Sequence, residues 1–261
     1  MSKIRDSFFL LTLFVSLVLS FWLLMSGTVL AEQLTPEEIM ERVDKNEHIE
    51  AARIESEMII QDRSREMIKE MIVYTESDNR RSNALTEFVN PRDRGTKYLK
   101  LGDDLWMYFP DAEDLVSISG HMMREGMMGS DFSYEDALES EQMVDLYKFE
   151  LVGEEQINGR DTYVLSAVAR EGEEVSYYER KLWVDQERFV TLREEYYSTG
   201  GRLLKVLEAE EVQEVTDGRW FAVKSVMNDK LKEDSQTVYK IHEIDFDYEI
   251  PEDLISLDTL Q

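Results

Sequence analysis

Segments with strand character follow one another from residue 51 to residue 249 with one long interruption, and they constrain the fold more than any other feature of the sequence. In the last segment, residues 237–249, the apolar Ile244, Phe246 and Tyr248 alternate with acidic residues. A period of two places one set of side chains on each face of a strand. Turn dipeptides such as Asn-Gly, Asp-Gly and Gly-Gly separate the segments, so the sequence predicts antiparallel hairpins in series.

The number of strands limits the architecture. We predict about ten or eleven antiparallel strands, and a twisted sheet of that size must curl or close. The expected fold is mainly β (α+β), with a single strongly curved antiparallel sheet that forms a half-open β-barrel. Its concave apolar face needs a cover, and only two segments lack strand character, an N-terminal helix and Gly120 to Tyr147. We expect helices from these segments to cover that face.

The N-terminal helix has a clear start. Thr35 is placed to cap it, Pro36 occupies the first helical position, and Glu38 completes a capping box. The helix is expected to end near Asn46. Its apolar stripe consists of Ile39, Met40 and Val43.

The interruption between the strands is rich in methionine and glycine. Four methionines fall within seven residues: Met122, Met123, Met127 and Met128. Methionine is flexible and polarizable, so this cluster suits either an irregular gap in a core or a soft surface that contacts apolar ligands. The need to cover the sheet favours the second interpretation, a lid. Ser133 and Asp136 are spaced to cap a short helix, Tyr134 to Tyr147, which would close it.

The first 31 residues have the pattern of a secretory signal peptide. A basic start precedes the apolar run Phe8 to Met25, and Val29-Leu30-Ala31 provides a small-residue cleavage site. The expected division is a signal peptide at 1–31 and one domain at 32–261. The apolar run is 18 residues long, close to the ~20 of a membrane span, so an uncleaved anchor is the alternative.

Charge and cysteine content exclude several classes of partner and chemistry. The chain has 29 basic and 56 acidic residues, a net charge of −27. This balance disfavours nucleic acid and anionic membrane surfaces as direct partners. The absence of cysteine excludes disulfides, a thiol nucleophile and lipidation of an N-terminal cysteine.

No catalytic or metal-binding motif stands out. The three histidines, His48, His121 and His242, are scattered singly, without metal-ligand spacing. Ser119 and His121 lie near Asp131, but no Gly-x-Ser-x-Gly elbow is present. Acidic turns such as Asp111 to Asp114 lack EF-hand spacing, and solvated turns explain them better. We therefore predict no enzyme activity, no metal and no cofactor; a hydrolase with unrecognised motifs is the least favoured alternative.

Three blocks carry a family resemblance. They are Phe88 to Thr96, Leu105 to Pro110 and Met128 to Asp136, the last reading Met-Gly-Ser-Asp-Phe-Ser-Tyr-Glu-Asp. In this order they resemble the outer-membrane lipoprotein-sorting protein family, the LolA-like group. The resemblance continues through Leu182 to Asp185 and Gly201 to Lys205 and covers nearly all of the chain after residue 31. The acidic run Asp111 to Asp114 departs from the family, in which basic residues are frequent at that rim.

The resemblance implies an exported carrier, located in the periplasm or at the extracytoplasmic face of the membrane. Such a protein binds acyl chains of lipids or lipoproteins in an apolar cavity and shuttles them across the cell envelope. An inner-membrane transporter or exporter would be its partner, and we expect a monomer. The alternative is an envelope-stress sensor or adaptor that binds a membrane protein or lipid exporter through the same fold.

Combining the lid with this ligand class gives a set of candidate site residues. The residues expected to line or gate the cavity are Met122, Met123, Met127, Met128 and Phe132, together with Trp106 and Tyr108 on an adjoining strand. Plain core packing is an equally good explanation of the aromatic residues. Gly126 and Gly129 are expected to act as hinges. The residues expected to hold the backbone through caps and turns are Ser130, Asp131, Ser133 and Asp136.

Overall fold

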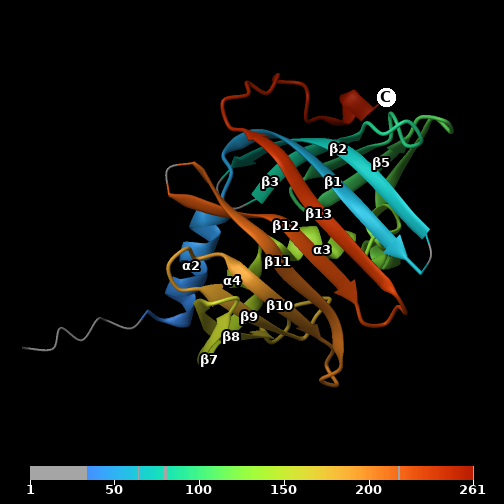
Figure 1. The fold of residues 1–261 in the computed structure, drawn as a ribbon. Coiled ribbons are helices and arrows are strands. Elements are labelled where there is room, and N and C mark those ends of the chain that lie inside the picture. Colours follow the sequence, from blue (N-terminus) through green and yellow to red (C-terminus); the bar gives the residue numbers. More distant parts are fainter. Residues whose placement is uncertain (1–33, 64, 79–80, 217, 261) are drawn as a thin grey trace, which may run out of the picture. The chain divides into compact units, whose positions relative to one another are not determined.

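The computed structural model describes residues 34–63, 65–78, 81–216 and 218–260 (Figure 1). The predicted signal peptide or anchor, residues 1–31, lies outside the described residues, so the division of the chain stays a prediction. No helix among the described residues is long and apolar enough to cross a membrane. Residues 35–261 cluster into one compact unit.

The described residues form one antiparallel sheet of thirteen strands. The strands are β1 (Ala51–Asp62), β2 (Arg65–Asp78), β3 (Arg81–Phe88), β4 (Lys97–Leu101), β5 (Asp104–Phe109), β6 (Asp114–Ile118), β7 (Tyr147–Ile157), β8 (Arg160–Ala169), β9 (Glu179–Asp185), β10 (Thr191–Tyr197), β11 (Leu203–Thr216), β12 (Arg219–Asp229) and β13 (Ser235–Asp245). Their order in the sheet is β6-β5-β4-β3-β2-β1-β13-β12-β11-β10-β9-β8-β7. The sheet is not closed, because β6 and β7 remain its two edges.

The predicted mainly β, open-barrel class is confirmed, but the predicted number of strands was too low. The short edge strand β6 lies in a stretch for which the sequence predicted no strand. Its five residues, Asp-Leu-Val-Ser-Ile, follow an acidic run and precede Ser119 and Gly120, so they show no clear alternation of their own. Pairing of Leu105 with Ile118 and of Met107 with Val116 holds them in the sheet.

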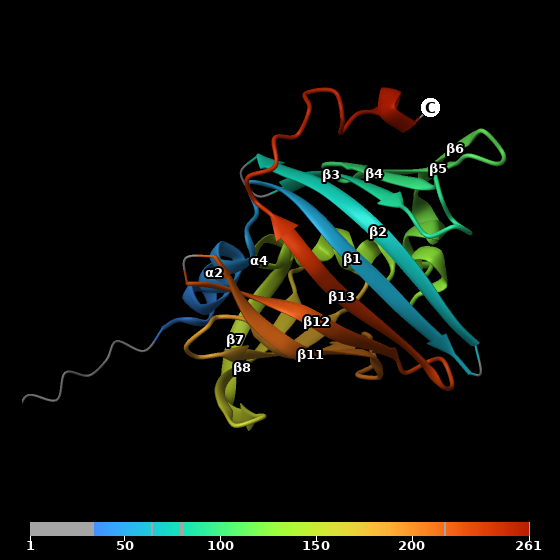
Figure 2. The ribbon, with the colours of Figure 1, turned by 45° about the horizontal axis from the view of Figure 1, so that its top comes forward.

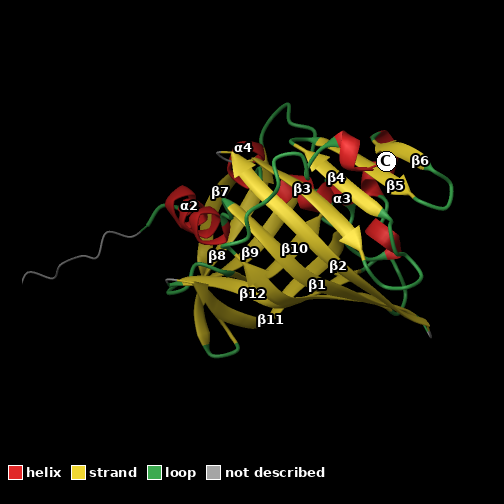
Figure 3. Ribbon diagram, turned by 90° about the horizontal axis from the view of Figure 1, so that it is seen from above, coloured by secondary structure: helices red, strands yellow, loops and turns green. Residues whose placement is uncertain are grey.

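The order of the strands explains where the non-strand segment must lie. From the centre of the sheet the chain runs outward to one edge, β6, and after residue 146 it resumes at the opposite edge, β7, before returning to β13 beside β1. Residues 119–146, which we call the cover segment, therefore have to connect the two edges. The curve of the sheet and the position of α3 inside it are visible in Figures 1 and 3. The predicted lid position thus follows from the topology.

Three α-helices lie within the described residues: α2 (Pro36–Glu47), α3 (Tyr134–Ser140) and α4 (Met143–Leu146). The predicted start of α2 is confirmed, since the Thr35 hydroxyl accepts a hydrogen bond from the Glu38 N–H at 3.2 Å and the Glu38 carboxylate accepts one from the Thr35 N–H at 2.8 Å. The single helix predicted from Tyr134 to Tyr147 is instead broken into α3 and α4. Gln142 between them leaves the helical region, with φ −118° and ψ 13°.

The cover segment also contains two short 3-10 helices, η1 (Gly120–Arg124) and η2 (Met127–Gly129), and a third, η3 (Leu257–Leu260), lies near the C-terminus. Within the curve of the sheet, buried side chains of β1, β2 and β5 form a core with Tyr134 and Leu138 of α3. On the other face, Leu260 of the C-terminal segment packs against Leu85 and Leu99. Figure 2 shows the course of this segment as a ribbon. Both faces of this half of the sheet are therefore covered.

Candidate functional site

A cavity of about 420 Å³ lies between the concave face of the sheet, α2 and the cover segment. Its lining contains six methionines contributed by β1, β2, β12, α2, α4 and the cover segment: Met40, Met58, Met71, Met127, Met143 and Met227. Its size falls within the ~300–1,000 Å³ that is usual for small-molecule pockets. Because methionine is flexible and polarizable, these walls can adapt to an apolar ligand of variable shape.

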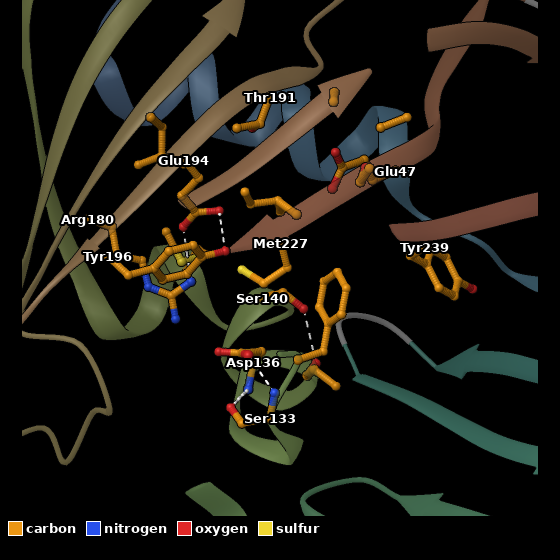
Figure 4. Close-up of a pocket in the computed structure, with 18 of the residues that line it drawn as sticks. Glu47, Ser133, Asp136, Ser140, Arg180, Thr191, Glu194, Tyr196, Met227 and Tyr239 are labelled. Carbon is orange, nitrogen blue, oxygen red and sulfur yellow. Dashed lines mark hydrogen bonds and ion pairs between the residues drawn. The ribbon is translucent and has the colours of Figure 1, made fainter. Parts of the chain in front are cut away.

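The two sides of the cavity differ in chemistry. The side made by β2, β1, β13 and β12 is largely apolar, with Met58, Met71 and Met227 alongside Tyr239. The opposite side carries charged and polar groups from β9, β10, α2 and α3: Asp44, Glu47, Ser133, Asp136, Ser140, Arg180, Thr191, Glu194 and Tyr196. Figure 4 shows most of these side chains around the same space. The cavity is therefore amphipathic.

Arg180, on β9, is the charged group most deeply enclosed in this wall, with 2% of its surface exposed. Its guanidinium donates to the Glu194 carboxylate at 3.1 Å and to the Tyr147 hydroxyl at 3.2 Å, and it forms a short ion pair with Glu139 of α3. Three tyrosine rings surround it, with centroids at 5.1, 5.2 and 5.0 Å: Tyr147, Tyr177 and Tyr196. Buried charge is tolerated when it is paired and hydrogen-bonded in this way.

Two carboxylates that line the cavity have raised pKa values. Burial raises the pKa of Glu194 despite its bond to Arg180. Loss of hydration, followed by the negative charges of Asp44 and Glu194, raises the pKa of Glu47 to about 7. Glu47 remains exposed, at the C-terminal end of α2, so its hydration is only partly removed and the neighbouring charges matter for this shift. Glu47 can therefore change its charge near neutral pH.

The start of α3 is fixed to the strands behind it. Ser133 and Asp136 form a capping box at its N-terminus. The Asp136 carboxylate also accepts hydrogen bonds from the Lys205 ammonium and from the Tyr177 hydroxyl, both at 2.7 Å. These contacts hold the polar end of the cavity in place.

Asp131 anchors the cover segment to the hairpin of β12 and β13. Its side chain is fully buried and accepts hydrogen bonds from the hydroxyls of Ser235 at 2.7 Å and Thr237 at 3.0 Å, and from the Lys232 ammonium at 3.0 Å. Beside it, the Ser130 hydroxyl bonds to the backbone of Phe132. These bonds attach the turn to the hairpin.

The two glycines of the cover segment are required by the backbone. A Cβ atom at Gly126 would collide with the carbonyl oxygen of Ser130, and Gly129 has φ +83°, a conformation that other residues rarely adopt. Their role as hinges stays a prediction.

The predicted cavity residues separate into three groups: two line the cavity, three pack beside it, and two lie on the other side of the sheet. Met127 and Phe132 line the cavity. Met122, Met123 and Met128 lie outside its lining and pack against the core formed by the concave face and α3.

Trp106 and Tyr108 lie on the opposite side of the sheet from the cavity, packed with Leu254 and Ile255 of the C-terminal segment. The reason is strand alternation, because their neighbours Leu105 and Met107 take the inward positions on β5.

Sequence reasoning missed the Arg180 site and the acidic end of α2. One signal was available: Arg180 shares its strand face with the apolar Leu182 and Val184, and an arginine in such a register indicates a buried, paired charge. Glu139 and Glu194 could not be paired with it without the tertiary structure. Among the described residues, no group of three or more His, Asp or Glu side chains is arranged to hold a metal ion.

Comparison with known proteins gives a family and a fold. Residues 80–261 match the model of a family described as "Uncharacterized protein". A search of curated proteins found no match. Among solved structures, a DUF1329 family protein from Desulfovibrio piger is 26% identical, with a TM-score of 0.80 over 87% of this chain and 98% of that chain.

Two further solved structures share the fold. A putative outer membrane lipoprotein-sorting protein domain from Vibrio parahaemolyticus is 24% identical, with a TM-score of 0.76 over 86% of this chain and 97% of that chain. A LolA superfamily protein from Nitrosomonas europaea is 21% identical, with a TM-score of 0.70 over 87% of this chain and all of that chain.

Proposed function

The chain belongs to the family whose model matches residues 80–261 and has the fold of LolA-like proteins, and from this premise we propose that it is an exported carrier which shields acyl chains from water. The observation that carries the proposal is the methionine-lined cavity beneath a segment that connects both edges of the sheet. Such a site binds and releases a ligand without needing catalytic groups.

The energetics of acyl chains fit this site. Removing an acyl chain from water is favourable by about 0.8 kcal/mol per buried methylene. A carrier therefore needs a continuous apolar wall, which Met58, Met71 and Met227 supply, and a cover that can move aside. The cover segment contacts the sheet through ion pairs and hydrogen bonds as well as apolar side chains, and these polar contacts can exchange with water when it opens.

The names of the similar structures point in the same direction. The Vibrio parahaemolyticus structure is that of a putative lipoprotein-sorting domain, and the Nitrosomonas europaea protein belongs to the LolA superfamily. Together with the predicted signal peptide, they support a location outside the cytoplasm and a role in carrying lipids or lipoproteins within the cell envelope. A transporter or exporter in the inner membrane would load or unload the carrier.

Mass spectrometry of organic extracts tests the proposal. The protein is expressed with its own N-terminal segment and purified without detergent, and we expect a co-purified lipid. The variant Met127→Glu should lose this lipid, because Met127 lines the cavity. Met122→Glu is the matched control, since Met122 is equally half-buried on the same segment but outside the cavity.

Circular dichroism establishes that both variants keep the sheet. A wild-type protein that is repeatedly empty, or equal lipid retention by the two variants, would contradict the carrier function. A membrane protein that co-purifies with the delipidated chain would support a sensor or adaptor instead.

A further inference from the structure

The volume of the cavity limits the number of chains that it can hold. A methylene group needs roughly the ~30 Å³ that a water molecule occupies in the liquid. The cavity of about 420 Å³ therefore accommodates a single aliphatic chain of moderate length. A second chain of similar length would have to extend beyond this space.

The arrangement of the walls gives the bound chain a direction. Every charged residue of the described lining lies on β9, β10, α2 or α3, whereas the lining residues of β2, β1, β13 and β12 are all uncharged. In the sheet, β11 lies between β10 and β12, and β11, β12 and β13 lie between β10 and β1. The aliphatic chain therefore faces Met58, Met71 and Met227, and the head group faces the charged side.

The described part of the cavity wall has no cation available for an anionic head group. Arg180 is the one basic residue among the described residues of the lining, and it is already bound by Glu139, Glu194 and the Tyr147 hydroxyl. The nearby Lys205 is engaged by Asp136. An anionic head would need to displace one of these buried carboxylates, which leaves an uncompensated charge.

The same side of the cavity presents carboxylates from three different elements. Asp44 and Glu47 come from α2, Asp136 from α3 and Glu194 from β10. Figure 4 shows Glu47, Glu194 and Asp136 around the cavity. Glu47 is exposed, so a head group can reach it without breaking the Arg180 site. Asp136 and Glu194 are already paired with Lys205 and Arg180, so an ammonium group in this cavity finds its complementary partner in Glu47.

From these observations we infer that the ligand of this cavity is an amphiphile with one aliphatic chain and an amine head group, oriented with the amine toward Glu47. The inference rests on the proposed function and narrows it, because it selects a single-chain ligand over multiply acylated ones and a cationic head over an anionic one. Neither the fold nor the family resemblance specifies this choice.

Calorimetric titration with a matched series of ligands tests the inference. Dodecylamine, dodecanol and dodecanoate have the same chain with a cationic, neutral or anionic head, and didodecylamine has the amine with two chains. Titrations are made with delipidated protein in a buffer above the pKa of Glu47, where its carboxylate is ionised. We expect dodecylamine to bind about tenfold or more tightly than dodecanoate, with dodecanol in between and didodecylamine much weaker than dodecylamine.

A pair of variants on α2 locates the head group. Glu47→Gln should reduce the affinity for dodecylamine several-fold and leave that for dodecanol unchanged. Glu41→Gln is the control, because Glu41 is exposed on the same helix and does not line this cavity. Equal effects of the two substitutions on dodecylamine binding would contradict the assigned orientation.

The outcomes separate this inference from the proposed function. If none of the dodecyl ligands binds, the carrier function itself fails. If dodecanol or dodecanoate binds as tightly as dodecylamine, or if didodecylamine binds equally well, the cavity still accepts acyl chains but the inferred ligand class is wrong.

Discussion

At the scale of single residues, Arg180 is the group on which the polar wall of the cavity depends. It is almost fully buried, and it connects Glu139 of the cover segment with Glu194 of the sheet. A buried ion pair is not in itself a large source of stability, because desolvation offsets much of the attraction. Removing one partner is costly, however, since the remaining charges are left buried without compensation.

Arg180→Met should therefore lower the free energy of unfolding by about 3–5 kcal/mol, measured by urea denaturation. Arg193→Met is the comparison. Arg193 lies on the outer face of β10, is partly exposed and pairs with Glu195 and Glu208, so its loss should cost about 1 kcal/mol or less. Similar decreases in the free energy of unfolding for the two variants would mean that the buried ion pairs of Arg180 stabilise the protein no more than the partly exposed pairs of Arg193.

At the scale of elements, the cover segment is attached to both halves of the sheet. Glu141 accepts from Lys100 of β4 at 2.8 Å, whereas Asp136 accepts from Lys205 of β11 at 2.7 Å. The break between α3 and α4 directly follows Glu141, whose carboxylate is held by β3 and β4. The cover therefore joins two sides of an open sheet that strand pairing leaves apart.

Ser133→Ala tests how far the cap of α3 holds this attachment. The substitution removes the hydroxyl that accepts from the Asp136 N–H, and loss of an N-cap costs about 1 kcal/mol. We expect faster hydrogen exchange across α3 with little change in the strands. In contrast, Ser140→Ala should leave exchange unchanged, because the exposed Ser140 hydroxyl donates only to the Ala137 carbonyl. Unchanged hydrogen exchange across α3 in Ser133→Ala would show that the N-cap does not stabilise this part of the cover segment.

At the scale of the whole molecule, the pairing of β1 with β13 makes one sheet from two series of strands. The register runs from Arg53 opposite Asp245 to Asp62 opposite Ser235, and it joins the first strand of the chain to the last. Neither series is a separate body, because β1 of the first series pairs with β13 of the second. The cover segment also connects their outer edges, β6 and β7.

We therefore expect a single cooperative unfolding transition. Trp106 on β5 and Trp183 on β9 report on the two series. Two variants each keep one of these tryptophans and carry Phe at the other, at Trp22 and at Trp220. In each variant, the urea midpoint measured by fluorescence should coincide with the midpoint measured by circular dichroism. A fluorescence midpoint that departs from the circular dichroism midpoint in either variant would show that the series unfold independently.

Local patterns in the sequence determined the class of fold and the ends of its first helix. The turn dipeptides between strands and the Thr35 capping box depend on neighbours a few residues away, so they can be recognised without the rest of the chain. The strand predicted at 237–249 was too long, because β13 ends at Asp245 and the alternating residues 246–249 lie beyond it. The same patterns left β6 unrecognised, because its five residues become a strand through pairing with β5. The number of strands was therefore harder to predict than the class of fold.

The sequence by itself determined that a curved antiparallel sheet needs a cover and that the methionine-rich segment supplies it. Only the tertiary structure decided which side chains meet beneath that cover. Alternation states that Trp106 and Leu105 point to opposite faces, but the face that becomes concave depends on the register and twist of distant strands. Arg180 likewise meets Glu139 and Glu194 through contacts between residues far apart in the chain, which no local pattern encodes.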